Sequence, residues 1–160
     1  MLTVTVLCVG RLKERYLKDG VDEYRKRLGA FCRPVVLEVD EERLPDNPSP
    51  AQIEAGIAAE GGRILPKIPA GAYLISLCIE GKGMSSPQLA ETIASAAVNG
   101  TSQICFVIGG SFGLWDRVKA KSHLCLSMSA MTFPHQLARL MLCEQIYRAF
   151  QIQTGGKYHK

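Results

Sequence analysis

The sequence predicts an α/β fold built on one mostly parallel sheet with helices on both faces. Three observations support this class. Short apolar runs alternate along the chain with longer segments of helical character. Ser-Pro pairs stand where some of those longer segments begin, and Gly or Pro stands where others end. Strands that alternate with helices in this way are typical of parallel sheets. The 160 residues form one domain over residues 1–160, with no linker or repeat.

Five runs have the length and the apolar content of strands that are buried on both faces. They cover residues 2–9, 34–39, 72–79, 103–108 and 124–127. The first run lacks a preceding basic region, so we interpret it as a strand and not as a signal peptide. No apolar run approaches the roughly 20 residues of a membrane-spanning helix, and no membrane association is expected.

Helices are expected between the strands, over residues 14–28, about 50–65, 87–99, 115–121 and about 134–152. The first helix places four apolar residues on one face, namely Leu17, Val21, Tyr24 and Leu28. Ser49 and Gln52 form a capping box around Pro50. Ser86 is expected to cap the next helix, and residues 80–84 before it are expected to form a flexible loop.

The cysteines are expected to be reduced residues of the core of a cytoplasmic protein. No CxxC pair occurs among the six, which are Cys8, Cys32, Cys78, Cys105, Cys125 and Cys143. Most of them lie inside apolar runs, and a disulfide framework is not expected in a chain without an export signal. The spacing also lacks the pattern of a metal site, so no metal is expected.

The net charge of +4 is unevenly distributed along the chain. Residues 117–160 hold seven Lys or Arg and one acid, whereas residues 1–116 hold twelve Lys or Arg and fourteen acids. A basic C-terminal third favours an anionic partner, of which RNA is the common one. A solvated basic face explains the asymmetry equally well, so charge alone leaves both interpretations open.

Ligands of open α/β sheets bind outside the carboxyl ends of the strands. Three such ends are candidates here: Leu77, the pair Gly109-Gly110, and residues 128–133. The glycines allow close approach to the backbone, and the methionines offer apolar surface for a flat ring. Each loop alone is more simply a tight turn or part of the core. The three loops together favour a nucleotide-cofactor site.

Known nucleotide fingerprints are absent, because no GxGxxG follows the first strand and no GxxxxGK[ST] occurs. A dehydrogenase or an ATPase is therefore not expected. Residues 109–113 do match GxSxG, the nucleophile motif of α/β-hydrolases. A hydrolase triad of Ser111, Glu144 and His159 would have a permitted chain order. The pattern is loose, however, and a glycine-rich ligand loop explains it as well.

The last helix and the residues after it carry several polar candidates. His135 lies in the first helical turn, where the helix dipole favours the neutral imidazole. Arg139 and Arg148 are nine residues apart and should face different directions. We expect Arg148 to belong to the site, although a salt bridge to Glu144 is the simpler role. The C-terminal Tyr158 and His159 would fray unless they dock on this chain or on a second subunit.

Six blocks of this sequence resemble the family of ribosomal RNA large subunit methyltransferase H, small members of the SPOUT methyltransferases. The resemblance covers essentially the whole chain. The blocks are residues 9–13, 24–28, 106–110, 127–136, 144–150 and 158–160, and the resemblance is strongest in the C-terminal ones. It implies a homodimer whose C-terminal part is threaded as a trefoil knot, a topology that is rare among proteins.

The resemblance further implies S-adenosylmethionine as methyl donor and methylation of N3 of a pseudouridine in 23S rRNA, on assembled ribosomes in the cytoplasm. Carried onto this sequence, the cofactor-binding residues are Leu77, Gly109, Met128, Ser129, Ala130, Met131, Thr132 and Phe133.

The same resemblance indicates that the C-terminal residues complete the site. We expect His159 to act as base or orienting acceptor, Tyr158 to position the target base, and Arg148 to stabilise anionic charge. Lys119 and Lys121 are expected to contact RNA. The alternative function is a non-catalytic, ribosome-associated module that binds RNA or a nucleotide.

Overall fold

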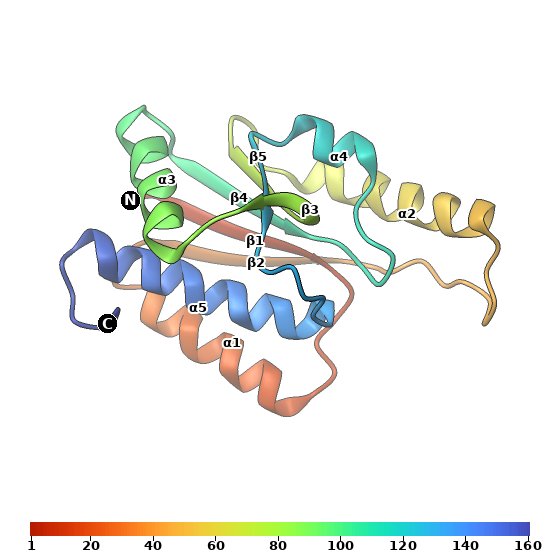
Figure 1. Ribbon diagram of the computed structural model, residues 1–160, viewed down its shortest axis with the longest axis horizontal. Coiled ribbons are helices and arrows are strands. Elements are labelled where there is room, and N and C mark those ends of the chain that lie inside the picture. The colour runs from red at the N-terminus through yellow and green to blue at the C-terminus, as the bar shows by residue number, and fades with distance from the viewer.

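The computed structural model describes residues 1–160 and contains one parallel sheet of five strands (Figure 1). The strands are β1 (Thr3–Val9), β2 (Arg33–Val39), β3 (Tyr73–Gly83), β4 (Gln103–Ile108) and β5 (Leu124–Ser127). They lie in the order β2-β1-β4-β3-β5, and every pairing is parallel. The predicted fold class is confirmed, and all five carboxyl ends meet at one edge of the sheet.

The helices are α1 (Arg15–Leu28), α2 (Pro50–Ile64), α3 (Ser86–Val98), α4 (Asp116–Lys121) and α5 (His135–Gln153), with a short 3₁₀ turn over Leu65–Lys67. One face of the sheet is covered by α1, α3 and α5, and the other by α2 and α4 (Figure 1). None of these helices is long and apolar enough to cross a lipid bilayer.

Side chains of the central strands alternate between two apolar cores, as the period of a strand requires. In β1, Val4 and Val6 point into the core below α1, α3 and α5. Leu7 and Val9 belong to the core below α2 and α4. Because both faces are covered, these strands are apolar on both sides, and this explains why they form near-continuous apolar runs in the sequence.

Strand β3 is longer than predicted, and the expectation of a flexible loop over residues 80–84 is wrong. Leu126 of β5 pairs with Leu77 and again with Lys82, so β3 bends around β5. Gly81 permits this contact, because a Cβ there would lie 2.6 Å from the carbonyl oxygen of Cys125. The wrapping brings residues 80–83 against β5, and the knotted threading stays a prediction.

The capping residues at the helix starts are as predicted, with one error. The capping box of Ser49 and Gln52 is confirmed, with Pro50 in the first turn of α2. In α3 the cap is Ser85 and not Ser86, because the Ser85 side chain accepts the backbone N–H of Gln88. Both serines precede Pro87, and the cap is the one that lies three residues before a glutamine.

All six cysteines are free thiols, as predicted. Five are buried, and Cys125 is half-buried. Burial raises the pKa of the Cys8 and Cys105 thiols to about 12. These thiols therefore stay protonated near neutral pH and act as small apolar core residues.

A buried ion pair joins the start of α5 to the sheet. Arg139 is 2% exposed, and its guanidinium donates to Glu38 of β2 at 2.7 Å and to the carbonyl of Gly10 at 3.0 Å. The carbonyl of Gly10 follows β1 directly, so this one side chain ties two strand ends to α5.

Replacing Arg139 with Met should lower the free energy of unfolding by about 2–4 kcal/mol, because Glu38 and the Gly10 carbonyl lose their charged donor. Chemical denaturation measures this loss. The matched control is Arg15→Met, whose ion pair with Asp19 is 88% and 66% exposed and should contribute less than about 0.5 kcal/mol. Equal effects for the two variants would refute the structural role of Arg139.

Candidate functional site

A large cavity, here called the edge cavity, opens at the carboxyl edge of the sheet. Its volume of about 980 Å³ lies in the range of sites for small molecules and cofactors. The loops after β4 and β5 and the wrapped part of β3 form its walls. Seven of the eight cofactor residues carried over from the resemblance line it, which are Leu77, Gly109, Met128, Ser129, Met131, Thr132 and Phe133. Ala130 lies in the same loop but does not line the cavity.

The loop after β4 owes its shape to its glycines. Gly113 has a φ of +100°, and its N–H donates to the carbonyl of Gly110 at 3.1 Å. A Cβ on Gly109 would lie 2.7 Å from the Gly113 carbonyl oxygen. Glycine at position 109 is therefore required by the loop's own backbone, whereas the sequence argument attributed it to close approach of a ligand.

The loop after β5 leaves backbone donors free. Within it, Ser127 Oγ donates to the Ser129 carbonyl, and the N–H of Met131 donates to Ser129 Oγ. The N–H groups of Ala130, Thr132 and Phe133 have no partner in the protein. Free donors beside apolar side chains suit a ligand that combines a flat ring with polar groups.

Two charged residues that sequence reasoning did not assign to the cofactor site also line the edge cavity. Lys119 donates to Glu80 at 2.5 Å, which raises the pKa of Lys119 and lowers that of Glu80. Because the Lys119 charge is neutralised by Glu80, this residue is not a free RNA contact. Lys121 is exposed. No sequence signal linked Glu80 to Lys119, because 39 residues separate them.

His135 lines the edge cavity and is half-buried. Burial lowers its pKa, and nearby Arg139 and Lys13 act in the same direction, whereas Glu41 opposes them. The predicted neutral imidazole agrees with this direction. The main cause, however, is desolvation and not the helix dipole.

We expect an NMR titration of the His135 ring to give a pKa below the ordinary value of about 6.5. A lowered folded-state pKa means that the unfolded chain binds the proton more readily, so stability contributed by neutral His135 is complete above about pH 6.5 and declines as the pH falls below it. The variant His135→Gln should lose this part of the acid sensitivity. A measured pKa at or above 6.5 would contradict the assignment.

No group of three or more His, Cys, Asp or Glu side chains is arranged to hold a metal ion.

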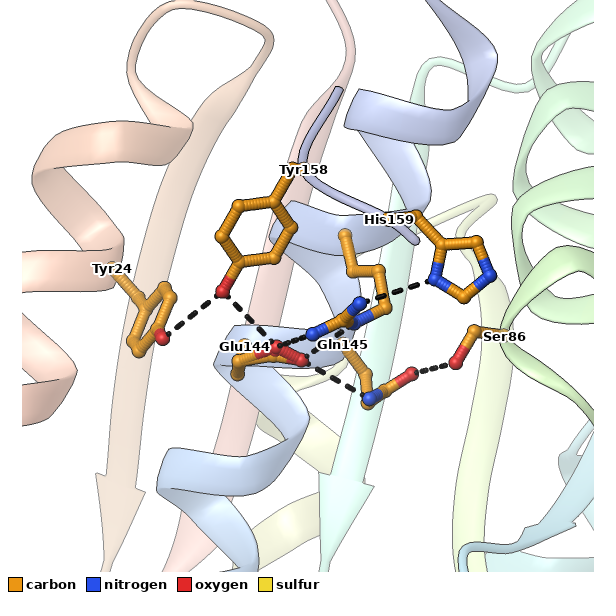
Figure 2. A network of polar contacts seen from close by, with 7 residues as sticks. Tyr24, Ser86, Glu144, Gln145, Tyr158 and His159 are labelled. Carbon is orange, nitrogen blue, oxygen red and sulfur yellow. Dashed lines mark hydrogen bonds and ion pairs between the residues drawn. The ribbon is translucent and has the colours of Figure 1, made fainter. Parts of the chain in front are cut away.

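Polar residues of the last helix form a network of contacts with the C-terminal segment (Figure 2). Glu144 accepts from Arg148 Nε at 2.9 Å and from Arg148 Nη2 at 3.2 Å. Arg148 Nη1 lies 3.1 Å from Nδ1 of His159. The predicted Glu144–Arg148 salt bridge is thus present, and Arg148 contacts Glu144 and His159 at the same time.

Tyr158 docks on its own chain. Its hydroxyl lies 3.3 Å from the hydroxyl of Tyr24 and donates to Glu144 at 3.4 Å (Figure 2). Its ring packs edge-on against Tyr147 at 4.9 Å and lies under the Arg148 guanidinium. The bond with Tyr24, burial and the charge of Glu144 raise the pKa of Tyr158 to about 12. This hydroxyl therefore stays protonated near neutral pH.

The edge cavity and the C-terminal network contact different parts of α5, because the cavity is lined by His135 and Ala138 and the network is built on Glu144 and Arg148. His135 opens the helix beside the cavity, and Arg148 follows thirteen residues later, about 20 Å along the helix axis at 1.5 Å per residue. Arg148, Tyr158 and His159 do not line the edge cavity. The eight predicted cofactor residues therefore come together in one region, and the three predicted catalytic residues come together in another.

The hydrolase triad is not assembled. Ser111 lines the edge cavity, in the turn between Gly110 and Gly113. Glu144 and His159 are both engaged by Arg148, and neither lines the edge cavity. The GxSxG match at residues 109–113 is therefore a tight turn at a cavity and not a nucleophile motif.

Arg139 and Arg148 face different surroundings, as predicted.

Residues 2–159 match the family model described as "Predicted SPOUT methyltransferase". The chain is 48% identical over 159 residues to ribosomal RNA large subunit methyltransferase H of Clostridioides difficile (strain 630), across 99% of this chain and 100% of that relative. It is 47% identical, with the same coverage, to the protein of that name from Carboxydothermus hydrogenoformans.

A solved structure shares the fold. It is described as a probable methylase family protein from Haemophilus influenzae Rd KW20, with a TM-score of 0.54 and 12% identity over 98% of this chain and 70% of that one. The sheet, the edge cavity and the family match define the chain as a SPOUT methyltransferase. Within that class it belongs to the ribosomal RNA large subunit methyltransferase H family.

Proposed function

We propose that this protein transfers a methyl group from S-adenosylmethionine to N3 of a pseudouridine in 23S rRNA, within an assembled ribosomal particle. The observation that carries the proposal is one cavity that β3 and the loops after β4 and β5 line together, in a chain of this family. The names of its relatives supply the substrate class, ribosomal RNA of the large subunit.

The residues of the edge cavity fit the cofactor. Apolar side chains such as Leu77 and Met128 would enclose the adenine ring. The free N–H groups of Thr132 and Phe133, which line the cavity, would bond its polar edges or the carboxylate. When bound, the cofactor supplies a sulfonium methyl group that a nitrogen lone pair can attack. The loops contribute by holding donor and acceptor in line, which accounts for much of the rate in such transfers.

The C-terminal network would act on the target base. N3 of pseudouridine lies between two carbonyls and carries a proton. This proton would pass to water as the N3–methyl bond forms and the sulfonium–methyl bond breaks. Arg148 would stabilise the negative charge that develops on a carbonyl oxygen. Tyr158, held protonated, would position the base and would not remove its proton.

His159 accepts from Arg148 through Nδ1 in this arrangement, so a neutral ring carries its proton on Nε2. Nε2–H would then donate to the target base, and the role of orienting donor fits better than the expected role of base or acceptor. A base role for His159 would require Nδ1 to leave Arg148.

The separation of network and cavity supports a homodimer. Because α5 holds the two apart within one chain, the network of one subunit would complete the edge cavity of its partner. Each composite site would then contain Gly109 from one chain and Arg148 from the other.

The function is tested by incubating the protein with labelled S-adenosylmethionine and large subunits from a strain that lacks the modification. We expect one labelled 23S rRNA position, identified as N3-methylpseudouridine by mass spectrometry, and little activity on a short free RNA stem. Tight binding to the particles without methyl transfer would instead indicate the non-catalytic binding module.

A further inference from the structure

A second, smaller cavity lies between α1, the edge strand β2 and the first turns of α5. Its volume is about 380 Å³, and four cationic side chains line it together with two carboxylates. The cations are Arg11, Lys18, Arg25 and Arg139, and the carboxylates are Asp22 and Glu38. We call this the basic cavity.

Two of the four cations have no acidic partner. Arg139 is paired with Glu38 at 2.7 Å, and Arg25 lies 4.0 Å from Asp22. Arg11 and Lys18 form no ion pair and are exposed. The cavity therefore carries two uncompensated positive charges, and its concave shape concentrates their field on whatever enters it.

Two other basic residues near the cavities are already engaged. Arg27 is bonded to Glu23 at 2.9 Å and lies over the ring of Tyr24. Lys119 is bonded to Glu80 in the edge cavity. Lys13 and Lys26 also form no ion pair, but they line neither cavity. Arg11 and Lys18 are distinguished because they are unpaired and share one cavity.

The basic cavity is connected to the edge cavity through the start of α5. Arg139 of the basic cavity donates to the carbonyl of Gly10 at 3.0 Å. On the other side of Gly10, His135 Nε2 lies 3.8 Å from the position that a Cβ would take. His135 in turn lines the edge cavity. A polyanion whose reacting group enters the edge cavity would lie close enough for its backbone to reach the basic cavity.

We propose that the basic cavity binds a backbone phosphate of the RNA strand that carries the target nucleotide, through Arg11 and Lys18. The inference rests on the proposed function, because it takes RNA as the substrate. Arg139, fixed by Glu38 and Gly10, forms the rigid wall of this phosphate site. Such contacts set position and affinity but do not read sequence, so they would hold the strand while the edge cavity selects the base.

The test compares Arg11→Gln/Lys18→Gln with the control Lys26→Gln/Lys67→Gln, which removes two exposed cations outside both cavities. In steady-state methyl transfer to large subunits, the first variant should raise KM for the particles about tenfold and leave kcat within about twofold. The slope of log affinity against log salt should fall by about two in magnitude. The control should change neither quantity, and thermal melting verifies that both variants fold.

Equal KM and equal salt slopes for the two double variants would overturn the inference. If the wild type transfers no methyl group, the proposed function fails, and equilibrium binding of the variants to the same particles still decides the phosphate site. Competition with inorganic phosphate distinguishes a phosphate of the RNA backbone from a free phosphate ion as the ligand of the basic cavity. An unchanged affinity for particles in the first variant, together with phosphate binding lost only there, would assign the cavity to a free anion and not to RNA.

Discussion

Removing residues 158–160 should lower methyl transfer at least about a hundredfold while the affinity for S-adenosylmethionine stays within about twofold, since positioned polar groups contribute this much to proton-transfer chemistry. The deletion removes the Tyr158 ring from Arg148 and Tyr147, and it removes the His159 partner of Arg148. The edge cavity lies at the other end of α5 and keeps all of its lining residues. Methyl transfer to large subunits and calorimetric binding of the cofactor measure the two effects separately.

Lys160→Ala is the matched control for this deletion, because Lys160 is exposed and makes no hydrogen bond or ion pair. It should retain full turnover. Turnover that survives the deletion unchanged would remove Tyr158 and His159 from the chemistry.

Gly109→Ala should abolish detectable cofactor binding and lower the free energy of unfolding by about 1–3 kcal/mol, since overpacking against backbone is costly. The added Cβ would lie 2.7 Å from the Gly113 carbonyl oxygen and 3.0 Å from the Leu114 side chain. The turn at residues 110–113 can accommodate it only by opening, and this turn forms a wall of the edge cavity. Calorimetry with S-adenosylmethionine and denaturant unfolding measure the two losses.

Gly83→Ala serves as the control, because a Cβ at Gly83 would meet no atom within 4 Å. That variant should bind the cofactor normally. Wild-type cofactor affinity in Gly109→Ala would show that the loop after β4 does not shape the cofactor site.

The two inactive variants together test whether the site is shared between subunits. A mixture of the tail-deleted chain and Gly109→Ala should regain about a quarter of wild-type activity, because half of the dimers are mixed and each has one intact composite site. A mixture that stays inactive, despite subunit exchange measured by mass spectrometry, would place the tail and the cavity of one site in the same chain.

Much of the fold could be predicted because local signals and tertiary structure agree. The strand over residues 103–108 is covered on both faces, so its apolar run marks its limits as the structure has them. The Ser49 capping box gives the start of α2 for a purely local reason. Agreement between local sequence signals and tertiary packing allows a sequence to specify one structure.

The errors arise where distant segments decide the outcome. Residues 80–83 look like a loop because they are polar and rich in glycine, yet they continue β3 by wrapping around β5. Gly81 is required by the backbone of Cys125, 44 positions along the chain, and no local pattern carries that information. Arg139 is likewise buried by partners at Gly10 and Glu38 that periodicity cannot reveal.

The candidate site was predicted in its parts and not in its arrangement. The rule that ligands bind at the carboxyl ends of parallel strands selected Leu77, Gly109 and residues 128–133, which the structure gathers around one cavity. The same rule says nothing about the C-terminal residues. Their separation from the cavity follows from the length of α5 and from the docking of Tyr158 on Tyr24.

The most direct measurement is a crystal structure of the protein with S-adenosylhomocysteine, the demethylated product, bound. The adenosyl group should lie in the edge cavity, between β3 and the loops after β4 and β5, in contact with the backbone of residues 128–133. Electron density for the product anywhere else on the molecule, or a cavity that stays empty at saturating product, would contradict the assignment of this cavity.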